Sequence, residues 1–544
     1  MQTQLFSQLD RHISHIKTIC NIDEVFVVGG AVRDILLWKS DYIVDVDLTM
    51  RSDPEKLWNK ITANKPLWVD IFRTEKFGTI TIITWWESIY AENSWKIKYE
   101  ITPFREESGY EDFRHPDKIL WSDSLVADAS RRDFTINAMY YYSLGKAIDN
   151  SQIVILTDQD VISNMFARGR YNHDIFISYC QQNNIDDKEI SWIVLDPYGW
   201  VEDLQSGKIR CVWDPDRRLS EDPLRILRAI RFQNSFNFSS EYDLDKWISF
   251  DYEKNTWLSM KKNYFLVKKI SKERIHEEVI KVFSWPNPFW YISILDELNL
   301  LKYIFPSVYN IKWLHQPVRY HPFDVYSHTL LALHYLQSIN TDPLVRLAML
   351  YHDVGKVEQY YSHTLHLQEQ DRSFIYGSWL NHVTCGVDMV EEDFSRIWFG
   401  NKEIQTISRY VAMHMKPGEI LISQKENQPK KIRALLSEGD YNKCHNLLDI
   451  CMWDRIWHYN PIQPPELEWV NHLRDLLDEI YNSEWQFTIH DMKINWEDIM
   501  KHYKIDWWPQ VGKYLRRARD RVLENPEDRN NKKKILTYLD KISS

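Results

Sequence analysis

Two aspartates one residue apart, Asp45 and Asp47, are the strongest candidates for chemistry in this sequence. They stand in the β-branched run IVDVDLTM, which predicts a strand, and alternate residues of a strand point to the same face. Two carboxylates there repel each other unless a cation neutralises them. Mg²⁺ bridging both carboxylates and a nucleotide's phosphates would do so, and a two-metal site stabilises the attacking and leaving oxygens of an in-line displacement. Glu100, in the later run IKYEITPF, could supply a third carboxylate. The alternative is an acidic strand face in solvent.

A candidate phosphate cradle precedes the acidic strand. The run VFVVGG predicts a strand that ends in Gly29 and Gly30 and leads directly into the predicted helix AVRDILLW. Glycines at this junction let backbone N–H groups approach a phosphate, and the helix dipole favours its negative charge. Arg33, on the first turn, would add a guanidinium fork. A Gly-Gly pair alone could be a tight turn, but the acidic strand that follows favours the phosphate interpretation.

A second constellation, Glu221, Asp222 and Arg225, is expected at the start of a helix, where offsets of three and four share a face. A carboxylate that accepts and a guanidinium that donates complement a base edge with an amino donor beside a ring-nitrogen acceptor. Cytosine and adenine show that edge, whereas guanine and uracil would leave buried polar groups unpaired. Such a pair could accept C and A and reject G and U, and selection of these bases without a nucleic-acid template is what the family resemblance described next implies. An ordinary salt-bridged helix is the alternative.

Five segments occur in an order that resembles a known enzyme family. They are GGAVRD (29–34), DVD (45–47), RRDFTINAMYY (131–141), EDPLRILRAIRF (221–232) and ERIHEEVIKVF (273–283). In this order they resemble the class II tRNA nucleotidyltransferases and bacterial poly(A) polymerases of the DNA polymerase β superfamily. The resemblance implies that Asp45 and Asp47 bind catalytic Mg²⁺ and that Gly30 and Arg33 hold the triphosphate. It further implies contacts to phosphate, ribose or nucleotide from Arg132, Asp133, Arg228 and Arg231.

Histidines and aspartates are spread through the second half of the chain, in the order His328, His352, Asp353, His382, His414 and Asp454. This order resembles an HD-domain metal phosphohydrolase. The resemblance implies a metal held by His328, His352, Asp353 and Asp454, with His382 and His414 in support. Imidazole and carboxylate ligands suit Mn, Ni or Fe, or Mg in an oxygen-rich version. The implied activity is phosphoester hydrolysis, for example of a 2′,3′-cyclic phosphate end on tRNA, and a degenerate scaffold is the alternative.

Composition places the chain among folded, soluble proteins. Its 544 residues are 44% hydrophobic and 27% charged, enough for three or four domains of roughly 150 residues. Six scattered cysteines without a CxxC pair argue against a disulfide framework or a cysteine-built zinc site. No apolar run approaches the length that spans a bilayer, and the start lacks the apolar block of a signal peptide. A cytoplasmic protein without membrane partners is therefore expected.

Periodicity predicts an α+β fold. Short β-rich runs, TITIITW among them, extend to about residue 142, and helical spacing of apolar residues dominates beyond 196. With the resemblance, this predicts a polymerase-β-like nucleotidyltransferase head, a mixed sheet with helices, followed by an all-α remainder. The expected segments are the head (1–150), an insertion without recognisable chemistry (151–195), a helical neck for nucleobase selection and RNA binding (196–295), an HD domain (296–460) and a helical tail for tRNA binding (461–544).

The expected function is addition of C and A to the 3′ end of tRNA from CTP and ATP with Mg²⁺, as the resemblance implies. A net charge of −11 does not favour generic RNA binding, so basic segments 261–274 and 513–534 are the candidates, unless they are solvated helix faces. Segment 108–125 resembles the loop this family needs for the terminal adenosine. An A-adding enzyme and a poly(A) polymerase share most of the motifs. An HD phosphohydrolase with a tRNA-binding module and a non-enzymatic RNA chaperone are alternatives of other classes, and the oligomeric state stays open.

Tryptophan and glycine counts are abnormal. The chain has 24 tryptophans and only 15 glycines, where typical usage of about 7% predicts roughly 38 glycines. By the family resemblance, glycine is expected at Trp38, Trp200, Trp496 and Trp508. A tryptophan at such a position is strained wherever φ is positive. One hypothesis is that UGA codons for glycine have been translated as tryptophan, and the alternative is a protein naturally rich in tryptophan.

Overall fold

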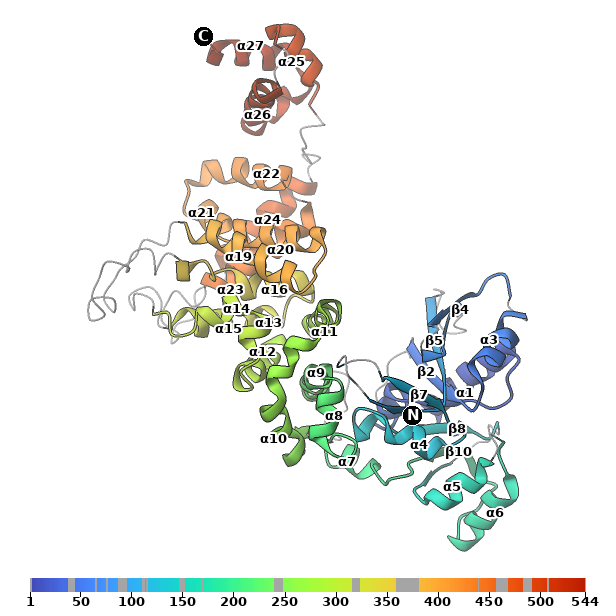
Figure 1. The fold of residues 1–544 in the computed structure, drawn as a ribbon. Helices are drawn as coiled ribbons and strands as arrows, with labels where there is room; N and C mark the ends of the chain where they lie inside the picture. Colours follow the sequence, from blue (N-terminus) through green and yellow to red (C-terminus); the bar gives the residue numbers. More distant parts are fainter. Residues whose placement is uncertain are drawn as a thin grey trace. The chain divides into compact units, whose positions relative to one another are not determined.

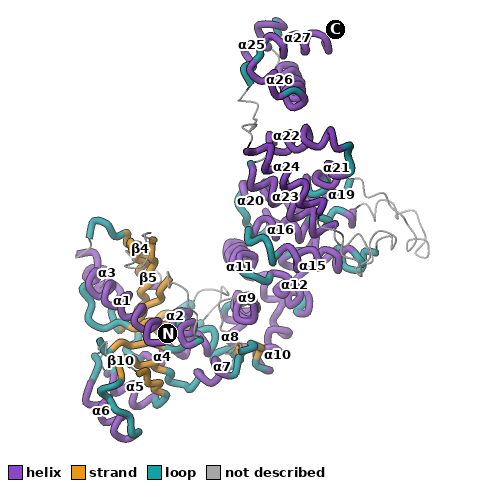
Figure 2. The backbone as a smooth tube through the Cα atoms, turned by 180° about the vertical axis from the view of Figure 1, so that it is seen from behind, coloured by secondary structure: helices purple, strands orange, loops and turns teal. Residues whose placement is uncertain are grey.

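A computed structural model describes most of the chain, in two compact units that are described separately (Figures 1 and 2). One unit comprises Met1–Glu278 with Glu297–Leu300, and the other comprises Val279–Asp296 with Leu301–Ser544. The described residues are 2–37, 45–63, 66–74, 77–86, 95–109, 113, 116–145, 152–167, 170–238, 248–315, 323–358, 381–438, 440–455, 468–482, 492–505 and 508–543. Among them, no helix is both long and apolar enough to cross a membrane.

The first unit is built on an eight-stranded mixed sheet with the strand order β3-β4-β5-β2-β1-β8-β10-β9. β2 pairs with β5 and β9 with β10 in parallel, and the other neighbours are antiparallel. The strands are β1 (Phe26–Val28), β2 (Asp45–Met50), β3 (Asp70–Thr74), β4 (Thr79–Trp86), β5 (Trp95–Pro103), β8 (Tyr140–Ser143), β9 (Gln152–Leu156) and β10 (Ile190–Leu195). The strands predicted from β-branched runs are therefore confirmed.

Smaller strands and helices complete this unit. Two two-stranded sheets lie outside the main one: β6 (Arg105–Ser108) with β7 (Lys118–Trp121), and β11 (Lys208–Ile209) with β12 (Asp251–Tyr252). The helices are α1 (Gln2–Cys20), α2 (Gly30–Leu36), α3 (Pro54–Ala63), α4 (Leu125–Ser130), α5 (Gln159–Met165), α6 (His173–Gln182), α7 (Val201–Gln205), α8 (Pro215–Glu221), α9 (Leu224–Phe238), α10 (Lys254–Asn263) and α11 (Lys272–Ser284). The β6–β7 hairpin lies within and beside segment 108–125.

Helices cover both faces of the sheet near its centre. On one face, Phe6 of α1 stacks on Tyr141 and Trp192 at centroid distances of 5.6 and 5.3 Å. Asp10 of the same helix accepts hydrogen bonds from the Tyr141 hydroxyl (2.6 Å) and from Trp192 Nε1 (2.7 Å). On the other face, α4, α5 and α6 contribute to a buried apolar cluster with alternate residues of β1, β8 and β10. The period-two alternation of the strands thus supplies both cores.

Residues 151–195, expected to be an insertion, supply part of the main sheet. ISWIVL in β10 is buried along its whole length, as expected of a strand covered on both faces, and it pairs with β8 and β9. We therefore propose that the head extends to about residue 195. The other segment boundaries stay predictions.

The second unit is helical in its described residues, as expected for the all-α remainder. Its helices are α12 (Pro288–Glu297), α13 (Leu301–Ile304), α14 (Pro306–Asn310), α15 (Val325–Leu336), α16 (Pro343–Tyr351), α19 (His382–Arg396), α20 (Asn401–Met413), α21 (Lys416–Leu421), α22 (Gln428–Glu438), α23 (Tyr441–Arg455), α24 (Glu468–Asn482), α25 (Trp496–Tyr503), α26 (Trp508–Glu524) and α27 (Lys532–Ser543). The helices α25, α26 and α27 have a buried apolar cluster of their own.

The tryptophans expected at glycine positions show no left-handed backbone where they are described. Trp38 lies outside the described residues. Trp200 has φ −79° before α7, and Trp496 and Trp508 are the first residues of α25 and α26. Among the tryptophans that the structure describes, positive φ values occur instead at Trp213, Trp313 and Trp398.

Candidate functional site

Three carboxylates come together where β2 and β5 run side by side. Asp45 and Asp47 point to the exposed face of β2, while Val46 and Leu48 between and after them are buried. In the parallel register Asp47 lies opposite Glu100. The predicted same-face arrangement of the acidic residues is therefore present.

A lysine stands among these carboxylates. Lys98 Nζ lies 2.6 Å from Glu100 Oε1 and 3.7 Å from Asp45 Oδ1. Desolvation by the surrounding protein, and then the charges of Asp45 and Glu100, raise the pKa of Asp47 to about 6, although its side chain still reaches solvent. The cluster therefore favours a cation, and its oxygen ligands are those that Mg²⁺ prefers.

The glycine pair brings the start of α2 close to the acidic cluster. Gly29 has φ +76°, and a Cβ built on it would lie 3.4 Å from Asp47 Oδ2. A side chain at this position would be strained and would crowd the carboxylate. The glycine thus leaves room beside Asp47 at the N-terminus of α2, although a helix of seven residues adds only a modest dipole.

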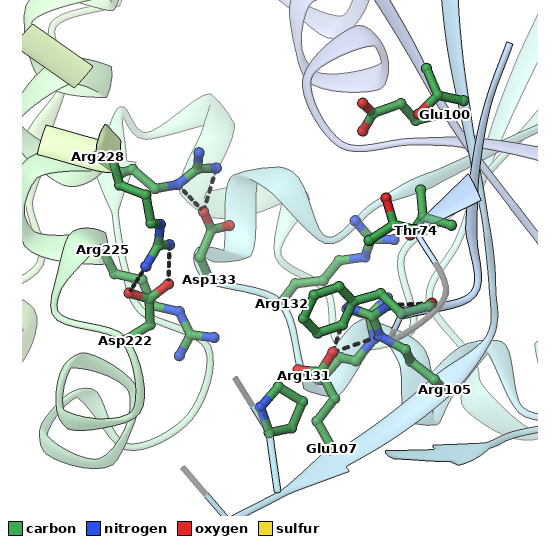
Figure 3. Close-up of a pocket in the computed structure, with 15 residues that line it drawn as sticks. Thr74, Glu100, Arg105, Glu107, Arg131, Arg132, Asp133, Asp222, Arg225 and Arg228 are labelled. Carbon is green, nitrogen blue, oxygen red and sulfur yellow. Dashed lines mark hydrogen bonds and ion pairs between the residues drawn. The ribbon is translucent and has the colours of Figure 1, made fainter. Parts of the chain in front are cut away.

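Beside Glu100 opens a cavity of about 510 Å³, within the size range of ligand pockets (Figure 3). Its walls carry both carboxylates and guanidinium groups, so it suits a ligand with negative charge and polar edges. The lining residues are Thr74, Phe77, Thr79, Thr81, Glu100, Arg105, Glu107, Pro116, Arg131, Arg132, Asp133, Asp222, Arg225, Arg228 and Arg274.

Two arginines of this cavity are held by a buried carboxylate that the sequence analysis missed. Asp128 accepts hydrogen bonds from Arg131 Nη2 (2.7 Å), Arg132 Nη2 (3.1 Å) and the Tyr140 hydroxyl (2.7 Å). Burial alone would raise the pKa of Asp128, but the two guanidinium groups outweigh it and lower the pKa to about 2. Asp128 precedes Arg131 by three residues and Arg132 by four. This helical spacing is the feature of the sequence that could have predicted the two ion pairs.

Asp133 is positioned from a different element. Arg228 of α9 donates from Nε (3.0 Å) and Nη2 (2.8 Å) to Asp133 Oδ2, and the two residues face each other in Figure 3. Burial would raise the pKa of Asp133, but Arg228 and Arg225 together lower it to about 2. The sequence-predicted residues Asp133 and Arg228 thus form one ion pair on the cavity wall.

The expectation that Glu221, Asp222 and Arg225 begin one helix is wrong. Glu221 is the last residue of α8, and Asp222 has an extended backbone (φ −145°, ψ 96°) that turns the chain into α9. Pro223 explains the turn, because proline lacks an N–H and disfavours helical backbone in the residue before it. The three side chains therefore meet at a corner between two helices.

At this corner, Asp222 and Arg225 are each held by another residue. Arg274 of α11 donates from Nη1 to Asp222 Oδ1 (3.0 Å) and from Nη2 to Oδ2 (2.6 Å). Arg225 Nη1 donates to Glu221 Oε2 (3.1 Å) and to the carbonyl of Arg218 (2.7 Å). The sequence analysis assigned no role to Arg274, although the residue stands in the segment ERIHEEVIKVF.

Other predicted nucleotide-binding residues do not line the cavity. Arg33 is buried, donates from Nη1 to Asn137 Oδ1 (2.6 Å) and lies over the Phe232 and Phe236 rings. Arg231 Nε donates to Glu278 Oε2 at 2.6 Å. Arg33 thus contacts α9 from the head, and Arg231 joins α9 to α11.

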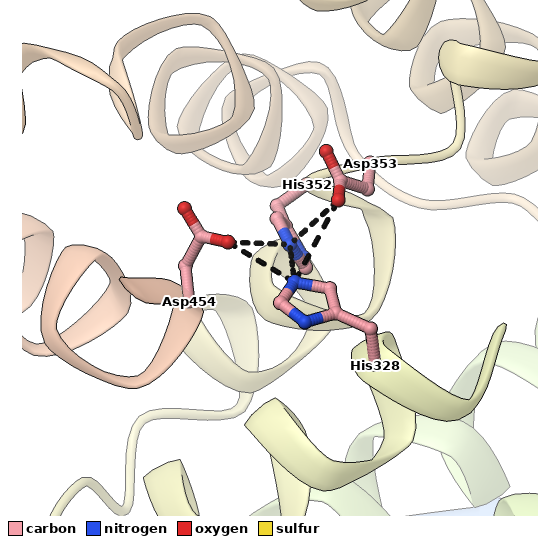
Figure 4. A group of neighbouring side chains, drawn as sticks. All are labelled: His328, His352, Asp353 and Asp454. Carbon is pink, nitrogen blue, oxygen red and sulfur yellow. Dashed lines mark hydrogen bonds and ion pairs between the residues drawn. The ribbon is translucent and has the colours of Figure 1, made fainter. Parts of the chain in front are cut away.

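A second cluster lies in the helical unit (Figure 4). His328 Nε2 lies 3.1 Å from Asp454 Oδ1 and 3.3 Å from His352 Nε2, which is itself 3.3 Å from Asp353 Oδ2. All four side chains are buried, and their candidate ligand atoms lie within 4.8 Å of one another. Four residues separated by up to 126 positions therefore converge with the spacing of a metal site.

The two supporting histidines join the same cluster through Asp353. His382 Nε2 lies 3.6 Å from Asp353 Oδ1 and 3.3 Å from His414 Nε2. The residues Asp353, His382 and His414 also have candidate ligand atoms within 4.8 Å of one another. Lys356 Nζ lies 2.5 Å from Asp353 Oδ2, so a lysine again neutralises part of the charge.

Neighbouring groups orient these imidazoles. The Nδ1 atoms of His352 and His414 lie 2.8 and 2.7 Å from the carbonyl oxygens of Met349 and Val411. Such contacts place the proton on Nδ1 and leave Nε2 to bind a metal. Gly355 allows the close approach of α19, since a Cβ there would meet the His382 carbonyl oxygen at 2.0 Å.

Three family models match the chain. The poly(A) polymerase head domain matches residues 25–155, a probable RNA- and SrmB-binding site of polymerase A matches 249–311, and the HD domain matches 325–456. The acidic cluster lies within the first match and the six HD residues lie within the third. The chain thus contains a poly(A) polymerase head domain and an HD domain, in the order that the motif resemblance predicts. The mixed sheet and the helical remainder also agree with the fold class predicted with it.

Individual relatives agree with this assignment. The CCA-adding enzyme of Lactobacillus helveticus is 33% identical over 266 residues, which are 48% of this chain and 47% of the relative. That of Ligilactobacillus salivarius is 29% identical over 280 residues, 52% of this chain and 50% of the relative. The chain thus spans about half the length of these curated relatives. The Bacillus stearothermophilus CCA-adding enzyme in complex with CTP has a similar fold, with a TM-score of 0.51, 19% identity and coverage of 99% of this chain and 96% of that one.

The raised pKa of Asp47 predicts that Asp47→Asn stabilises the metal-free protein at pH 7.5. With a folded-state pKa of about 6 against an ordinary 3.8, the stability from Asp47 is complete below about pH 4 and is lost as the pH rises through 6. The amide should raise the free energy of unfolding by up to about 1 kcal/mol in Mg²⁺-free buffer, since solvent screens part of the repulsion. Chemical unfolding at pH 7.5 and pH 5 measures this, and a gain that does not shrink at pH 5 would contradict it.

Proposed function

We propose that this protein adds C and then A to the 3′ end of tRNA from CTP and ATP, with Mg²⁺. The observation that carries the proposal is that Glu100 belongs both to the acidic cluster with Asp45 and Asp47 and to the wall of the cavity. The same wall carries arginines and the base-reading candidate Asp222. Relatives named CCA-adding enzymes support the same activity. The cytoplasm is the location proposed for this activity.

The acidic cluster fits a divalent cation, because three carboxylates share one face and Lys98 already stands between two of them. When bound by Asp45, Asp47 and Glu100, Mg²⁺ would supply activation of the RNA 3′ hydroxyl and stabilisation of the leaving pyrophosphate. Lys98 would then have to turn away from its carboxylate partners.

The cavity wall provides the contacts for the triphosphate and the sugar. Arg105, Arg131 and Arg132 line one side and would neutralise phosphate oxygens. Arg132 also interacts electrostatically with Asp47, which connects this wall to the acidic cluster. On the other side, Asp133 is held by Arg228 and would accept a hydrogen bond from a ribose hydroxyl.

Base selection would fall to Asp222 and Arg225. The Asp222 carboxylate accepts from the exocyclic amino group of cytosine or adenine, and the Arg225 guanidinium donates to the neighbouring ring nitrogen. Uracil and guanine place a carbonyl against the carboxylate, so a buried acceptor faces another acceptor. Such a mismatch excludes the wrong base far more strongly than a small difference in size does.

RNA binding is proposed for the basic segments. In segment 261–274, Lys261 and Lys262 form ion pairs with Glu297 and Asp216, and the side chain of Phe265 is exposed nearby in sequence. Lysines and an exposed aromatic ring suit phosphate contacts and base stacking. The family model for an RNA-binding site begins at residue 249 and includes this segment.

Single-nucleotide extension tests the proposal. We expect the protein to add two C residues and then one A to tRNA that lacks CCA, and no product from the doubly substituted protein Asp45→Ala, Asp47→Ala. A-addition only to tRNA ending in CC would identify an A-adding enzyme, and long A tails a poly(A) polymerase. A folded protein without incorporation on any of these RNAs would contradict the proposal.

A second candidate function belongs to the HD cluster. We propose that His328, His352, Asp353 and Asp454 bind a transition metal, or Mg²⁺, and that the site hydrolyses phosphoesters such as a 2′,3′-cyclic phosphate end of RNA. The burial of these four side chains supports this, as does a second buried group, Asp353, His382 and His414, that shares Asp353 with them. Ionisable groups are rarely buried without a charge to balance them. Burial alone would lower the pKa of His352, but Asp353 and Asp454 raise it to about 10. The two carboxylates therefore favour a positive charge at this imidazole, which a metal on Nε2 would supply in place of the proton.

Metal binding checks the second candidate independently of activity. Equilibrium dialysis against Mn²⁺ or Ni²⁺, followed by metal analysis, is expected to give at least one bound ion for a protein that already carries Asp45→Ala and Asp47→Ala. Asp454→Asn in that background should weaken this binding at least tenfold, whereas His502→Ala in the tail should not change it. Equal binding by all these variants would contradict the assignment.

A further inference from the structure

Asp222 is fixed at the α8–α9 corner by a residue 52 positions later in the chain. Arg274 donates one hydrogen bond to each oxygen of the carboxylate, at 3.0 and 2.6 Å. The side chains of both residues are largely buried, with exposed fractions of 14% and 19%. Such a fork determines the plane of a carboxylate as well as its position. Both residues line the cavity beside Arg225 and Arg228.

We propose that Arg274 is a positioning residue for base selection, which rests on the proposed function. The backbone N–H of Leu224 donates to Asp222 Oδ1 at 3.1 Å, so within the described part of the chain Oδ1 accepts two hydrogen bonds and Oδ2 accepts one. A carboxylate oxygen has two lone pairs. Oδ2 can therefore accept the amino group of cytosine or adenine in the plane set by Arg274.

Acceptor and donor are thus held by separate partners. Arg274 orients Asp222, and Glu221 together with the Arg218 carbonyl orients Arg225. Without Arg274, the Asp222 carboxylate could rotate about χ2 and accept from the ring N–H of uracil or guanine instead of facing their carbonyl oxygen. Removal of Arg274 should consequently weaken discrimination between bases more than it weakens the chemical step.

The experiment compares Arg274→Ala and Arg274→Lys with the unchanged full-length protein. The readout is kcat/KM for CTP against UTP on tRNA lacking CCA, and for ATP against GTP on tRNA ending in CC. We expect each ratio to fall at least tenfold in Arg274→Ala, mainly through KM of the correct nucleotide and through incorporation of the wrong one. Arg274→Lys keeps the charge without the fork and should lie between. Glu277→Ala, which alters an exposed side chain on the same helix, should leave the ratios unchanged.

The outcomes separate this inference from the proposed function. Equal loss with all four nucleotides would contradict the role of Arg274 and leave CCA addition standing. No incorporation by the unchanged protein would contradict both. Melting temperatures of the variants show whether a loss reflects unfolding, and in that case the Lys variant, which retains the ion pair, decides between the two roles.

A different observation concerns three tryptophans with left-handed backbone. Trp213, Trp313 and Trp398 have φ values of 61°, 64° and 70°, and more than half of each side chain is exposed. Among described residues, the other non-glycine residues with positive φ are mainly asparagines, which tolerate this region. For a bulky residue such a conformation is a genuine outlier.

Trp398 stands at the position that glycine usually occupies in a Schellman motif. Helix α19 ends at Arg396, followed by Ile397 as its C-cap. The N–H of Trp398 donates to the Ser395 carbonyl (3.2 Å) and that of Phe399 to the Phe394 carbonyl (3.0 Å), which is the hydrogen-bond pair of this motif. The rings of Phe394 and Phe399 pack at 4.7 Å, which is the apolar contact that accompanies it. Every feature of the motif is present except its glycine.

We infer that positions 213, 313 and 398 are glycine in the natural protein, encoded by UGA that the source organism reads as glycine. The backbone geometry agrees with the excess of tryptophan over glycine in the composition. Other tryptophans have the environment of genuine ones. Trp192 is buried and donates to Asp10, and Trp257 lies in α10 and stacks on Tyr252 at 5.1 Å.

Codons and stability test this second inference. We expect UGA at 213, 313 and 398 and UGG at 192 and 257 in the coding sequence, and UGG at all three left-handed positions would overturn the inference. In the protein, Trp313→Gly and Trp398→Gly should each raise the melting temperature by about 2–4 °C, because they relieve strain and remove an exposed indole. Trp257→Gly, the matched control in a helix, should lower it. Lowering by all three changes would contradict the assignment of glycine.

Discussion

Asp45, Asp47 and Glu100 bring three negative charges to one face of two neighbouring strands, and their mutual repulsion has to be balanced. Lys98 balances part of it, and Arg132 interacts electrostatically with Asp47 from the cavity side. The parallel pairing of β2 with β5 places Asp47 opposite Glu100. These carboxylates cannot move apart unless the two strands separate. A divalent cation would offset this repulsion. The carboxylates that destabilise the metal-free protein are therefore the same ones that are proposed to bind Mg²⁺.

Preorganisation by paired charges recurs around the cavity. Asp128 holds Arg131 and Arg132, Arg228 holds Asp133, and Arg274 holds Asp222. Each of these interactions orients at least one side chain that lines the cavity. Charged groups oriented in advance need little reorganisation when a nucleotide binds. In the HD cluster, backbone carbonyl oxygens orient the imidazoles of His352 and His414 in a similar way.

Local patterns were sufficient to predict the strands that carry the acidic residues. The alternation in IVDVDLTM places Asp45 and Asp47 on one face, and the structure agrees because the buried Val46 and Leu48 fix the register. The family motifs also predicted which HD residues meet, although His328 and Asp454 are 126 positions apart. Both predictions rest on several residues together, namely the alternation along the strand and the order of the HD residues, so one atypical residue would not have changed them.

Features that depend on tertiary contacts were not predictable in this way. The hydrogen bonds from Arg274 to Asp222 join two residues that are 52 positions apart. The strands β9 and β10 pair with each other in the main sheet, although their segment carries no recognisable motif. The corner at Asp222 is different, because Pro223 was visible in the sequence and its effect on the preceding residue was overlooked. Similarly, no composition count could single out Trp398, which only its backbone conformation identifies.

The decisive experiment is a crystal structure of the protein soaked with Mn²⁺ and a non-hydrolysable CTP analogue. We expect anomalous density for manganese between Asp45, Asp47 and Glu100, with the cytosine amino group against Asp222. Manganese bound elsewhere in the head, or a cytosine directed away from Asp222 and Arg225, would contradict it.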